Sequence, residues 1–205
     1  MRNNPYKDAL ILCLITLISG FLLCGVYYVT KDPIAKQSEM TLNNAYISVF
    51  KDADKFESDD KCETALKEYQ SYLTGDYGKN GLVLNDLKIA YADNESIGYV
   101  CDITTKDGYG GDIEIIIGIK NDLNVSGIEI LSISESPGLG MNAKNEEFLD
   151  QYINKNTDVF TVVKNKSNLQ DGEIDAISSA TITTSAMSNA VNGSLAIVKE
   201  VSGVK

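Results

Sequence analysis

The stretch DIEIIIGIKNDLNVSGIEILSI, residues 112–133, contains two short β-branched runs separated by an Asn-Asp turn. The runs Asp112 to Ile119 and Val125 to Ile133 are rich in isoleucine and valine, which suit a pleated, half-buried surface. Two similar runs, Leu87 to Tyr91 and Ile97 to Thr104, precede them and are also bounded by Asn, Asp or Gly residues. Consecutive short strands joined by turns predict an antiparallel sheet.

Helical periodicity flanks these strands on both sides. Apolar residues recur at helical spacing in residues 40–50 and 65–73 before the strands, and in residues 148–153 and 182–198 after them. One further strand is expected at Val159 to Val163. We therefore expect an α+β fold, in which one domain has an antiparallel sheet flanked by helices.

An apolar run from Ala9 to Val29 precedes the domain and is long enough to span a bilayer as a helix. A cleavable signal peptide is the alternative, because the run lies at the N-terminus. The run is long for a signal core, and Tyr27 and Tyr28 at its exit are typical of a membrane interface, so we predict an uncleaved anchor. The predicted organisation is a short N-terminal segment (1–8), a transmembrane helix (9–29), a juxtamembrane linker or helix (30–55) and one domain (56–205).

Charge restricts the partners and leaves the orientation open. The formal net charge of -11 argues against nucleic acid or anionic lipid headgroups as partners. Arg2 and Lys7 before the anchor balance Lys31 and Lys36 after it, so the positive-inside rule gives a tie. A large domain can cross a membrane largely regardless of its charge, which permits an extracytoplasmic domain.

Cysteines outside the anchor are limited to Cys62 and Cys101. Their separation matches no zinc, iron-sulfur or haem-attachment spacing, and the chain contains no histidine, so we predict no metal site. A disulfide between the two residues and a pair of buried thiols are both compatible with the sequence.

A cluster of small and hydroxyl residues, DAISSATITT at positions 175–184, leads into the last predicted helix. The first N–H groups of a helix lack partners and its dipole is positive there, so a phosphate is stabilised at such a start. An ordinary N-cap that binds nothing is the alternative. Because the chain has no histidine, no tryptophan and a single arginine, any redox chemistry has to come from a bound cofactor.

Written as D-x-x-S-S-A-T-x-T, this cluster resembles the flavinylation motif of the FMN-binding domain in the RnfG subunits of the Rnf electron transport complexes. It is also similar to the NqrC subunit of the sodium-translocating NADH:quinone reductase. In this family a threonine of the motif carries FMN through a phosphoester bond, and the resemblance assigns that bond to Thr183. Thr184 lies one residue out of register and is expected on the helix surface.

Two further motifs carry the same resemblance. Residues 135–140, ESPGLG, are similar to the family's E-T-P-G-L-G loop beside the flavin, and residues 108–111 match its G-Y-G-G turn. Residues 30–34, TKDPI, resemble the stretch after the family's anchor. The resemblance therefore implies flavin contacts from Glu135, Ser136, Gly138, Leu139, Gly140 and Tyr109, and phosphate contacts from Ser178, Ser179, Ala180 and Thr181.

Two positions depart from the family pattern. Ser179 stands where the family often has glycine, and Ser136 replaces the usual threonine. The change at Ser179 bears on backbone geometry, because serine tolerates a positive φ poorly.

The resemblance implies a membrane-anchored flavoprotein subunit of an ion-translocating ferredoxin:NAD oxidoreductase, which relays electrons through one covalent FMN and is coupled to Na⁺ or H⁺ transport. No catalytic side chain is expected, because the flavin supplies the redox chemistry. The implied partners are the other membrane and peripheral subunits and a flavin transferase, and the implied location is the cell membrane with the domain on the extracytoplasmic side. The alternative is a membrane-anchored FMN-binding sensory, regulatory or other reductase module outside an Rnf complex.

Overall fold

The computed structural model describes residues 5–72, 81–155, 157–164 and 168–203. The chain consists of two compact units, one that ends at Asn43 and one that begins at Asn44. Helix α1 runs from Pro5 to Val49, and Pro33 lies inside it. The transmembrane segment and the helix predicted at residues 40–50 are therefore parts of one helix, and the predicted linker is helical up to Val49.

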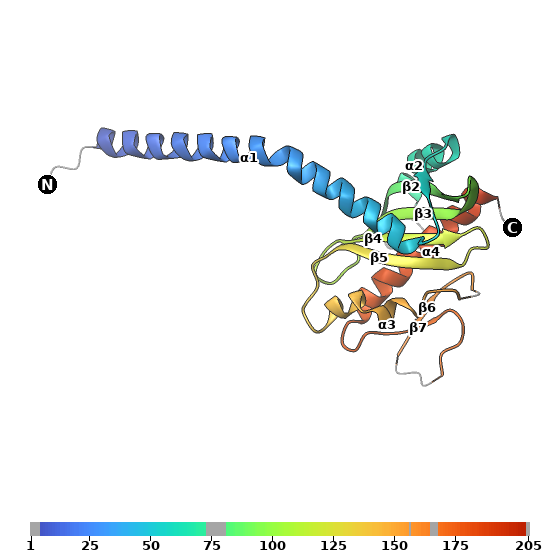
Figure 1. The fold of residues 1–205 in the computed structure, drawn as a ribbon. Helices are drawn as coiled ribbons and strands as arrows, with labels where there is room; N and C mark the ends of the chain where they lie inside the picture. The colour runs from blue at the N-terminus through green and yellow to red at the C-terminus, as the bar shows by residue number, and fades with distance from the viewer. Residues whose placement is uncertain (1–4, 73–80, 156, 165–167, 204–205) are drawn as a thin grey trace. The chain divides into compact units, whose positions relative to one another are not determined.

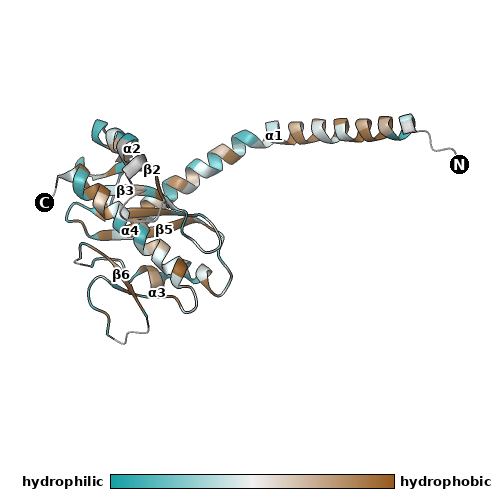
Figure 2. Ribbon diagram, turned by 180° about the vertical axis from the view of Figure 1, so that it is seen from behind, coloured by the Kyte–Doolittle hydropathy of each residue, from teal (hydrophilic) through white to brown (hydrophobic). Residues whose placement is uncertain are grey.

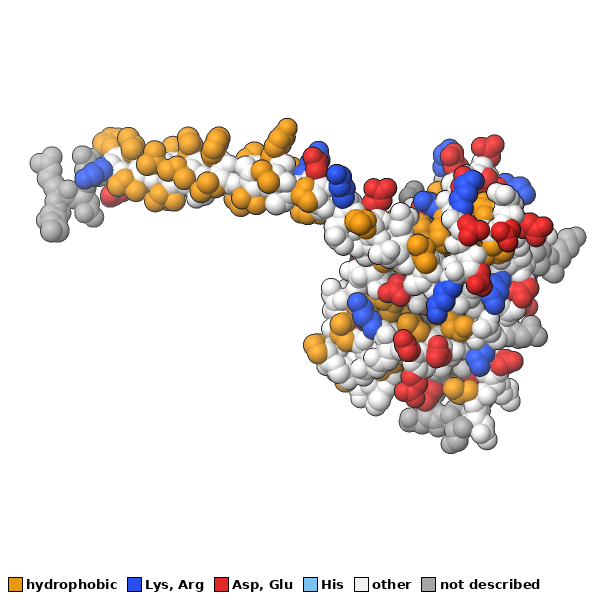
Figure 3. Space-filling model, viewed as in Figure 1, with side chains coloured by type: hydrophobic (Ala, Val, Ile, Leu, Met, Phe, Trp, Pro, Cys, Tyr) orange, Lys and Arg blue, Asp and Glu red, His pale blue; other side chains and the backbone are white. Residues whose placement is uncertain are grey.

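The first half of α1 is the apolar part of the helix. Among the described residues, α1 is the one helix that is long and apolar enough to cross a membrane. Its leucine, isoleucine and phenylalanine side chains from Leu10 to Leu23 are exposed, and charged residues follow only from Lys31 (Figures 2 and 3). An exposed apolar surface of this length needs lipid or partner helices around it. This helix agrees with the prediction of a single-pass membrane protein.

Five antiparallel strands form the main sheet in the order β1-β2-β3-β4-β5. The prediction of an antiparallel sheet is confirmed, and the helices that flank it complete an α+β domain (Figure 1). Strand β1 was not predicted, because three residues carry no measurable alternation. The strands are β1 (Lys55–Glu57), β2 (Leu82–Ala92), β3 (Glu95–Thr105), β4 (Ile113–Lys120) and β5 (Val125–Ile133).

The pairing register aligns the ends of three strands. Ile113 pairs with Thr105 of β3 and with Ile133 of β5. The loop between β3 and β4 therefore leaves the sheet at the same end as the segment that follows β5. This alignment brings the two glycine-containing motifs, residues 108–111 and 135–140, next to each other.

Helices α2 (Asp60–Tyr72) and α4 (Thr181–Ser202) pack on one face of the sheet. Alternate residues of the strands point into this core, as Cys101 and Ile103 of β3 do, while Val100 and Asp102 point to the other face. Met187, Val191 and their helical neighbours cover these strands from α4. Both helices were predicted. Leu73, which was expected to belong to α2, lies outside the described residues.

The end of α1 at Val49 and the following residue, Phe50, pack on the opposite face of the sheet. Three glycines on neighbouring strands make room for them: Gly98, Gly118 and Gly127. A Cβ on Gly127 would lie 2.7 Å from Val49 Cα, and Ser126 Oγ donates a hydrogen bond to the Val49 carbonyl at 2.7 Å. Close backbone approach explains why the isoleucine-rich strands contain these glycines.

The chain between β5 and α4 holds short elements. They are the 3₁₀ helix η1 (Gly140–Lys144), α3 (Glu146–Leu149), β6 (Thr161–Val163) and β7 (Glu173–Asp175). Strands β6 and β7 pair in parallel as a separate two-stranded sheet. The helix predicted at residues 148–153 is shorter than expected, and β7 was not predicted.

Cys62 and Cys101 are both free and buried. Burial raises the pKa of the Cys62 thiol to about 11 and that of Cys101 to about 12. Both groups therefore remain neutral thiols at neutral pH and lack the thiolate character that reactivity requires. Of the two arrangements compatible with the sequence, the structure has the buried thiols.

We predict that Gly127→Ala destabilises the domain by about 1–3 kcal/mol, because the new methyl group meets the Val49 backbone and the packed turn has to shift. Ser132→Ala, on the exposed side of the same strand, is the matched control and should change stability by less than about 0.5 kcal/mol. Denaturant unfolding of the two variants checks this. Equal stability of Gly127→Ala and wild type would contradict close packing of the Val49 backbone on Gly127.

Candidate functional site

Glu135 joins the two loops at the aligned end of the sheet. The residue is 7% exposed, and its Oε1 accepts a hydrogen bond from the Tyr109 backbone N–H at 2.7 Å. Gly110 packs against the Ser134 carbonyl so closely that a Cβ would overlap it. The turn of residues 108–111 is thus held against the residues that directly follow β5.

Gly140 brings η1 against Glu135 and the start of α4. A Cβ built on Gly140 would lie 2.6 Å from Glu135 Oε2 and 2.8 Å from Thr183 Oγ1. The two polar atoms therefore lie on either side of one small backbone position, no more than about 5.4 Å apart, which is the sum of these distances. Any side chain at this position would displace one of them.

The segment that leads into α4 is held by backbone contacts on both sides. The Asp175 N–H donates to Gln151 Oε1 at 2.7 Å, and the Ala176 N–H donates to the Val163 carbonyl at 2.9 Å. Further along α4, the side chain of Asn192 bonds both the N–H and the carbonyl of Phe160. Together these contacts place the first turn of α4 relative to β6, β7 and the main sheet.

Thr184 closes the turn that precedes α4. Its Oγ1 accepts a hydrogen bond from the Ile177 N–H at 3.1 Å and donates one to the Ala180 carbonyl at 3.0 Å. The side chain is fully buried, so the expectation that Thr184 lies on the helix surface is wrong. The hydroxyl turns inward because it supplies the acceptor for the Ile177 amide.

Thr183 differs from Thr184 in the hydrogen bonding of its hydroxyl. Its Oγ1 is buried, with the residue 1% exposed, and it is the one buried side-chain N or O atom without a hydrogen-bond partner among the described residues. Leaving a buried hydroxyl unpaired costs about 1–3 kcal/mol. The Thr183 hydroxyl is therefore free to pair with a ligand or a water.

Helix α4 begins without a side-chain cap. The N-cap residue is Ala180, whose side chain makes no capping hydrogen bond. Ser, Thr and Asp residues are abundant just before it, yet none occupies the cap position. The uncapped amides and the positive end of the dipole of this 22-residue helix remain available to an anion.

Ser179, directly before the N-cap residue, has a φ of 62°, in the left-handed region. From the sequence, serine in place of the family's glycine was predicted to affect the backbone geometry here, and the positive φ confirms this. The strain lies in the turn that shapes the helix start.

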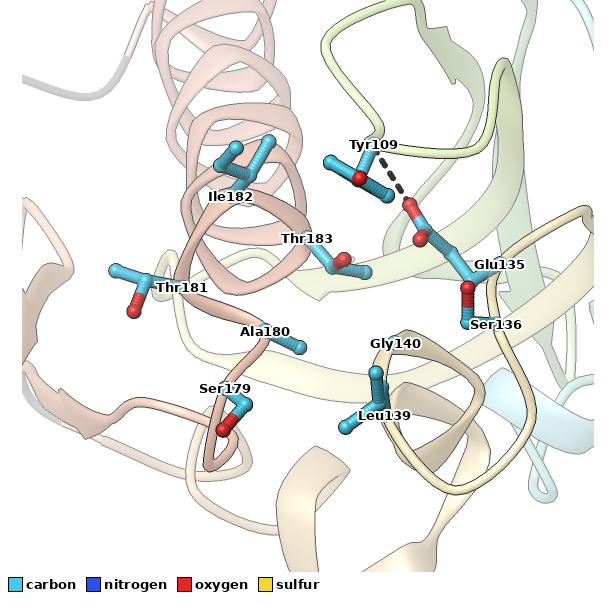
Figure 4. Close-up of a pocket in the computed structure, with 10 residues that line it drawn as sticks. All are labelled: Tyr109, Glu135, Ser136, Leu139, Gly140, Ser179, Ala180, Thr181, Ile182 and Thr183. Carbon is cyan, nitrogen blue, oxygen red and sulfur yellow. Dashed lines mark hydrogen bonds between the residues drawn. The ribbon is translucent and has the colours of Figure 1, made fainter.

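These elements enclose a cavity of about 460 Å³ (Figure 4). Thr183 points toward Glu135 across its interior, while Tyr109, Leu139 and Ile182 are 72%, 43% and 55% exposed. The cavity thus has polar groups at the helix start and apolar side chains open to solvent. Its lining is Tyr109, Glu135, Ser136, Leu139, Gly140, Ser179, Ala180, Thr181, Ile182 and Thr183.

The cavity brings together nine of the residues predicted for the site. Ser178 and Gly138 do not line it. Ser178 is exposed. Gly138 has a φ of 75°, and its carbonyl accepts a hydrogen bond from Asn142 Nδ2. Ile182 also lines the cavity but was not among the residues predicted for the site. Its apolar character was visible in the sequence, but its exposure depends on where the helix begins.

The donor set fits a phosphorylated planar ligand. The uncapped helix start suits a phosphate, the exposed apolar side chains suit an aromatic ring, and Thr183 Oγ1 offers an unpaired buried hydroxyl. FMN combines a phosphate with an aromatic ring system, and a cavity of this size lies within the range of small-ligand sites.

A single membrane-spanning helix followed by this domain defines the class: a membrane-anchored protein with an FMN-binding domain. The FMN-binding domain family matches residues 108–196, and the RnfG N-terminal region matches residues 1–49. The chain belongs to the RnfG family, the flavin-binding subunits of the ion-translocating ferredoxin:NAD(+) oxidoreductase (Rnf) complexes. The resemblance stated from the motifs is confirmed.

Relatives match along nearly the whole chain. The RnfG subunit of the proton-translocating ferredoxin:NAD(+) oxidoreductase complex of Clostridium ljungdahlii is 34% identical over 100% of this chain and 97% of its own length. The RnfG subunit of the Na(+)-translocating complex of Acetobacterium woodii is 28% identical over 96% and 93%. Among solved structures, Shewanella oneidensis NqrC covers 57% of this chain and 58% of its own, with a TM-score of 0.49 and 18% identity.

We predict opposite effects for the two adjacent threonines in the flavin-free protein. Thr184→Val leaves the Ile177 N–H without its acceptor and should destabilise the domain by about 1–3 kcal/mol. Thr183→Val removes an unpaired hydroxyl and should leave stability unchanged or raise it. Chemical denaturation measures both, and a larger loss for Thr183→Val would show that its hydroxyl has a partner.

We also predict that Ser179→Gly stabilises the protein by about 0.5–1 kcal/mol, because relief of the left-handed strain exceeds the added chain entropy of glycine. Ser178→Gly, at the exposed neighbour without a positive φ, is the control and should be neutral or destabilising. The comparison uses the midpoint of thermal unfolding. Stabilisation by both substitutions would contradict a strain specific to residue 179.

Proposed function

We propose that this chain is the membrane-anchored flavoprotein subunit of an ion-translocating ferredoxin:NAD oxidoreductase complex, and that it relays electrons through one FMN. The observation that carries this proposal is the uncapped start of α4 beside the unpaired Thr183 hydroxyl, in a cavity with exposed apolar side chains. The names of full-length relatives support the complex as its setting. When bound, the flavin supplies the redox chemistry.

The residues of the cavity have distinct roles in this proposal. The amides at the start of α4 and the hydroxyls of Ser179 and Thr181 bind the phosphate, and Ala180 leaves the backbone accessible. Tyr109, Leu139 and Ile182 contact the ring. Glu135 orients the loop that carries Tyr109, through the bond to its backbone.

Covalent attachment of the FMN phosphate to Thr183 is part of the proposal, and the geometry of two hydroxyls bears on it. Thr183 Oγ1 is unpaired and points across the cavity toward Glu135, although the residue is only 1% exposed (Figure 4). Thr181 is partly exposed and lines the cavity, but its side chain points away from Glu135 and Tyr109. The motif and the inward direction of the hydroxyl both favour Thr183, and a flavin transferase then reaches it through the mouth of the cavity.

The partners and the orientation follow the same proposal. The exposed apolar surface of α1 supports contact with membrane subunits of the complex, and a flavin transferase acts in maturation. We place the domain on the extracytoplasmic side, where a covalent bond retains a cofactor that would be lost by dilution. Relatives that match the anchor as well as the domain argue against a free-standing sensory module.

Coexpression with a flavin transferase tests the attachment. The wild-type chain should give a fluorescent band on a denaturing gel, and Thr183→Ala should lose it, because the oxygen that forms the ester is gone. Thr181→Ala should remain fluorescent. Thr184→Ser, which keeps the structural hydroxyl, is a second control and should also remain fluorescent.

Mass spectrometry of wild-type peptides locates the flavin directly. Loss of the band in Thr181→Ala with retention in Thr183→Ala would move the ester to Thr181. A wild-type chain that stays dark would contradict covalent attachment, and failure to copurify with other membrane subunits would contradict the assignment to a complex.

A further inference from the structure

Glu135 is a buried carboxylate that has no cationic partner among the described residues. It is 7% exposed, and no lysine or arginine in the described part of the chain forms an ion pair with it. Oε1 accepts from the Tyr109 N–H, whereas Oε2 faces Gly140 across from Thr183 Oγ1. A buried charge is costly unless it is paired, so its presence in the wall of the cavity indicates a function.

We infer that Glu135 sets the reduction potential of the bound flavin by opposing the negative charge that reduction adds to the ring. This inference rests on the proposed function, since it takes FMN as the occupant of the cavity. Glu135 is then a positioning and tuning residue that exchanges neither electrons nor protons with the flavin.

The physical basis is Coulomb repulsion in a poorly screened site. Reduction by two electrons with uptake of one proton gives an anionic ring, whereas two electrons and two protons give a neutral one. A ring inside a cavity of about 460 Å³ lies close to any charge in its wall, and a buried carboxylate acts on it through less water than a surface charge does. Glu135 therefore destabilises the anionic reduced ring and leaves the neutral reduced ring nearly unaffected.

The sign of the pH dependence follows from this difference. A nearby negative charge raises the pKa at which the reduced ring loses its second proton. Above that pKa the carboxylate lowers the reduction potential, and below it the effect disappears. A change in packing or hydrogen bonding would instead shift the potential by a similar amount at every pH.

Other titratable groups lie on the segments that surround Glu135. Tyr109 is the other titratable side chain of the cavity and is 72% exposed. The loop that carries Tyr109 also contains Lys106, Asp107 and Asp112, and η1 contributes Lys144. The first turn of α4, Thr181 to Thr184, has no titratable side chain. Glu135 is therefore the one carboxylate among the residues that line the cavity.

Glu135→Gln isolates the charge. Glutamine has nearly the same shape, and its amide oxygen can still accept the Tyr109 N–H, so the loop contact is retained. Glu147→Gln is the matched control, because it removes the same charge from an exposed position on α3.

The experiment is a spectroscopic redox titration of the purified, flavinylated full-length chain in detergent, with dithionite as reductant, over a range of pH. We expect Glu135→Gln to have a more positive potential than wild type at high pH and the same potential at low pH. The break in the plot of potential against pH should move to lower pH. Glu147→Gln should follow the wild type throughout.

Three results would overturn the inference: coincident curves for Glu135→Gln and wild type, a constant offset at all pH values, or an equal shift in Glu147→Gln. In each of these cases the chain still carries flavin, so the proposed function stands. A wild-type chain that binds no flavin overturns the proposed function, and the inference falls with it.

Discussion

The antiparallel register of β3, β4 and β5 is the constraint on which the site depends. Because Thr105, Ile113 and Ile133 are aligned across three strands, the 108–111 turn and the 135–140 loop emerge side by side. Glu135 then joins them with one hydrogen bond, and Gly140 lets η1 approach the start of α4. A slip of one residue in either pairing would turn the isoleucines out of the core and separate the two loops.

Much of the fold was accessible from the sequence because its main signals are local. Isoleucine-rich runs between turn residues identified four strands of the main sheet, and hydropathy alone identified the anchor. The three-residue strands β1 and β7 were missed, because they exist through pairing with distant segments rather than through their own pattern. The continuity of α1 through Pro33 was also missed, since a proline more often marks a boundary than the interior of a helix.

The candidate site was predictable as a set of motifs and less so as a geometry. Nine predicted residues line one cavity, and the left-handed φ of Ser179 follows directly from the glycine that the family often has there. The directions of the side chains did not follow: Ile182 lines the cavity and is exposed to solvent, Thr183 is buried and faces the cavity, and Thr184 bonds a backbone amide. Which side a helix residue presents near its first turn depends on where the helix starts, and sequence patterns locate helix ends poorly.

The charges of the cavity give a physical reason for the covalent attachment that we propose. No lysine or arginine is among the lining residues, and Glu135 is a buried carboxylate, so helix amides and hydroxyls alone would stabilise a phosphate here. A free phosphate monoester carries about -1.5 to -2 charges at neutral pH, which such a site would hold weakly. Esterification to a threonine removes one ionisable oxygen and leaves about one negative charge, close to what an uncapped helix start accommodates. A bond to the protein therefore lowers the charge that the site must bear and also makes retention of the flavin independent of affinity.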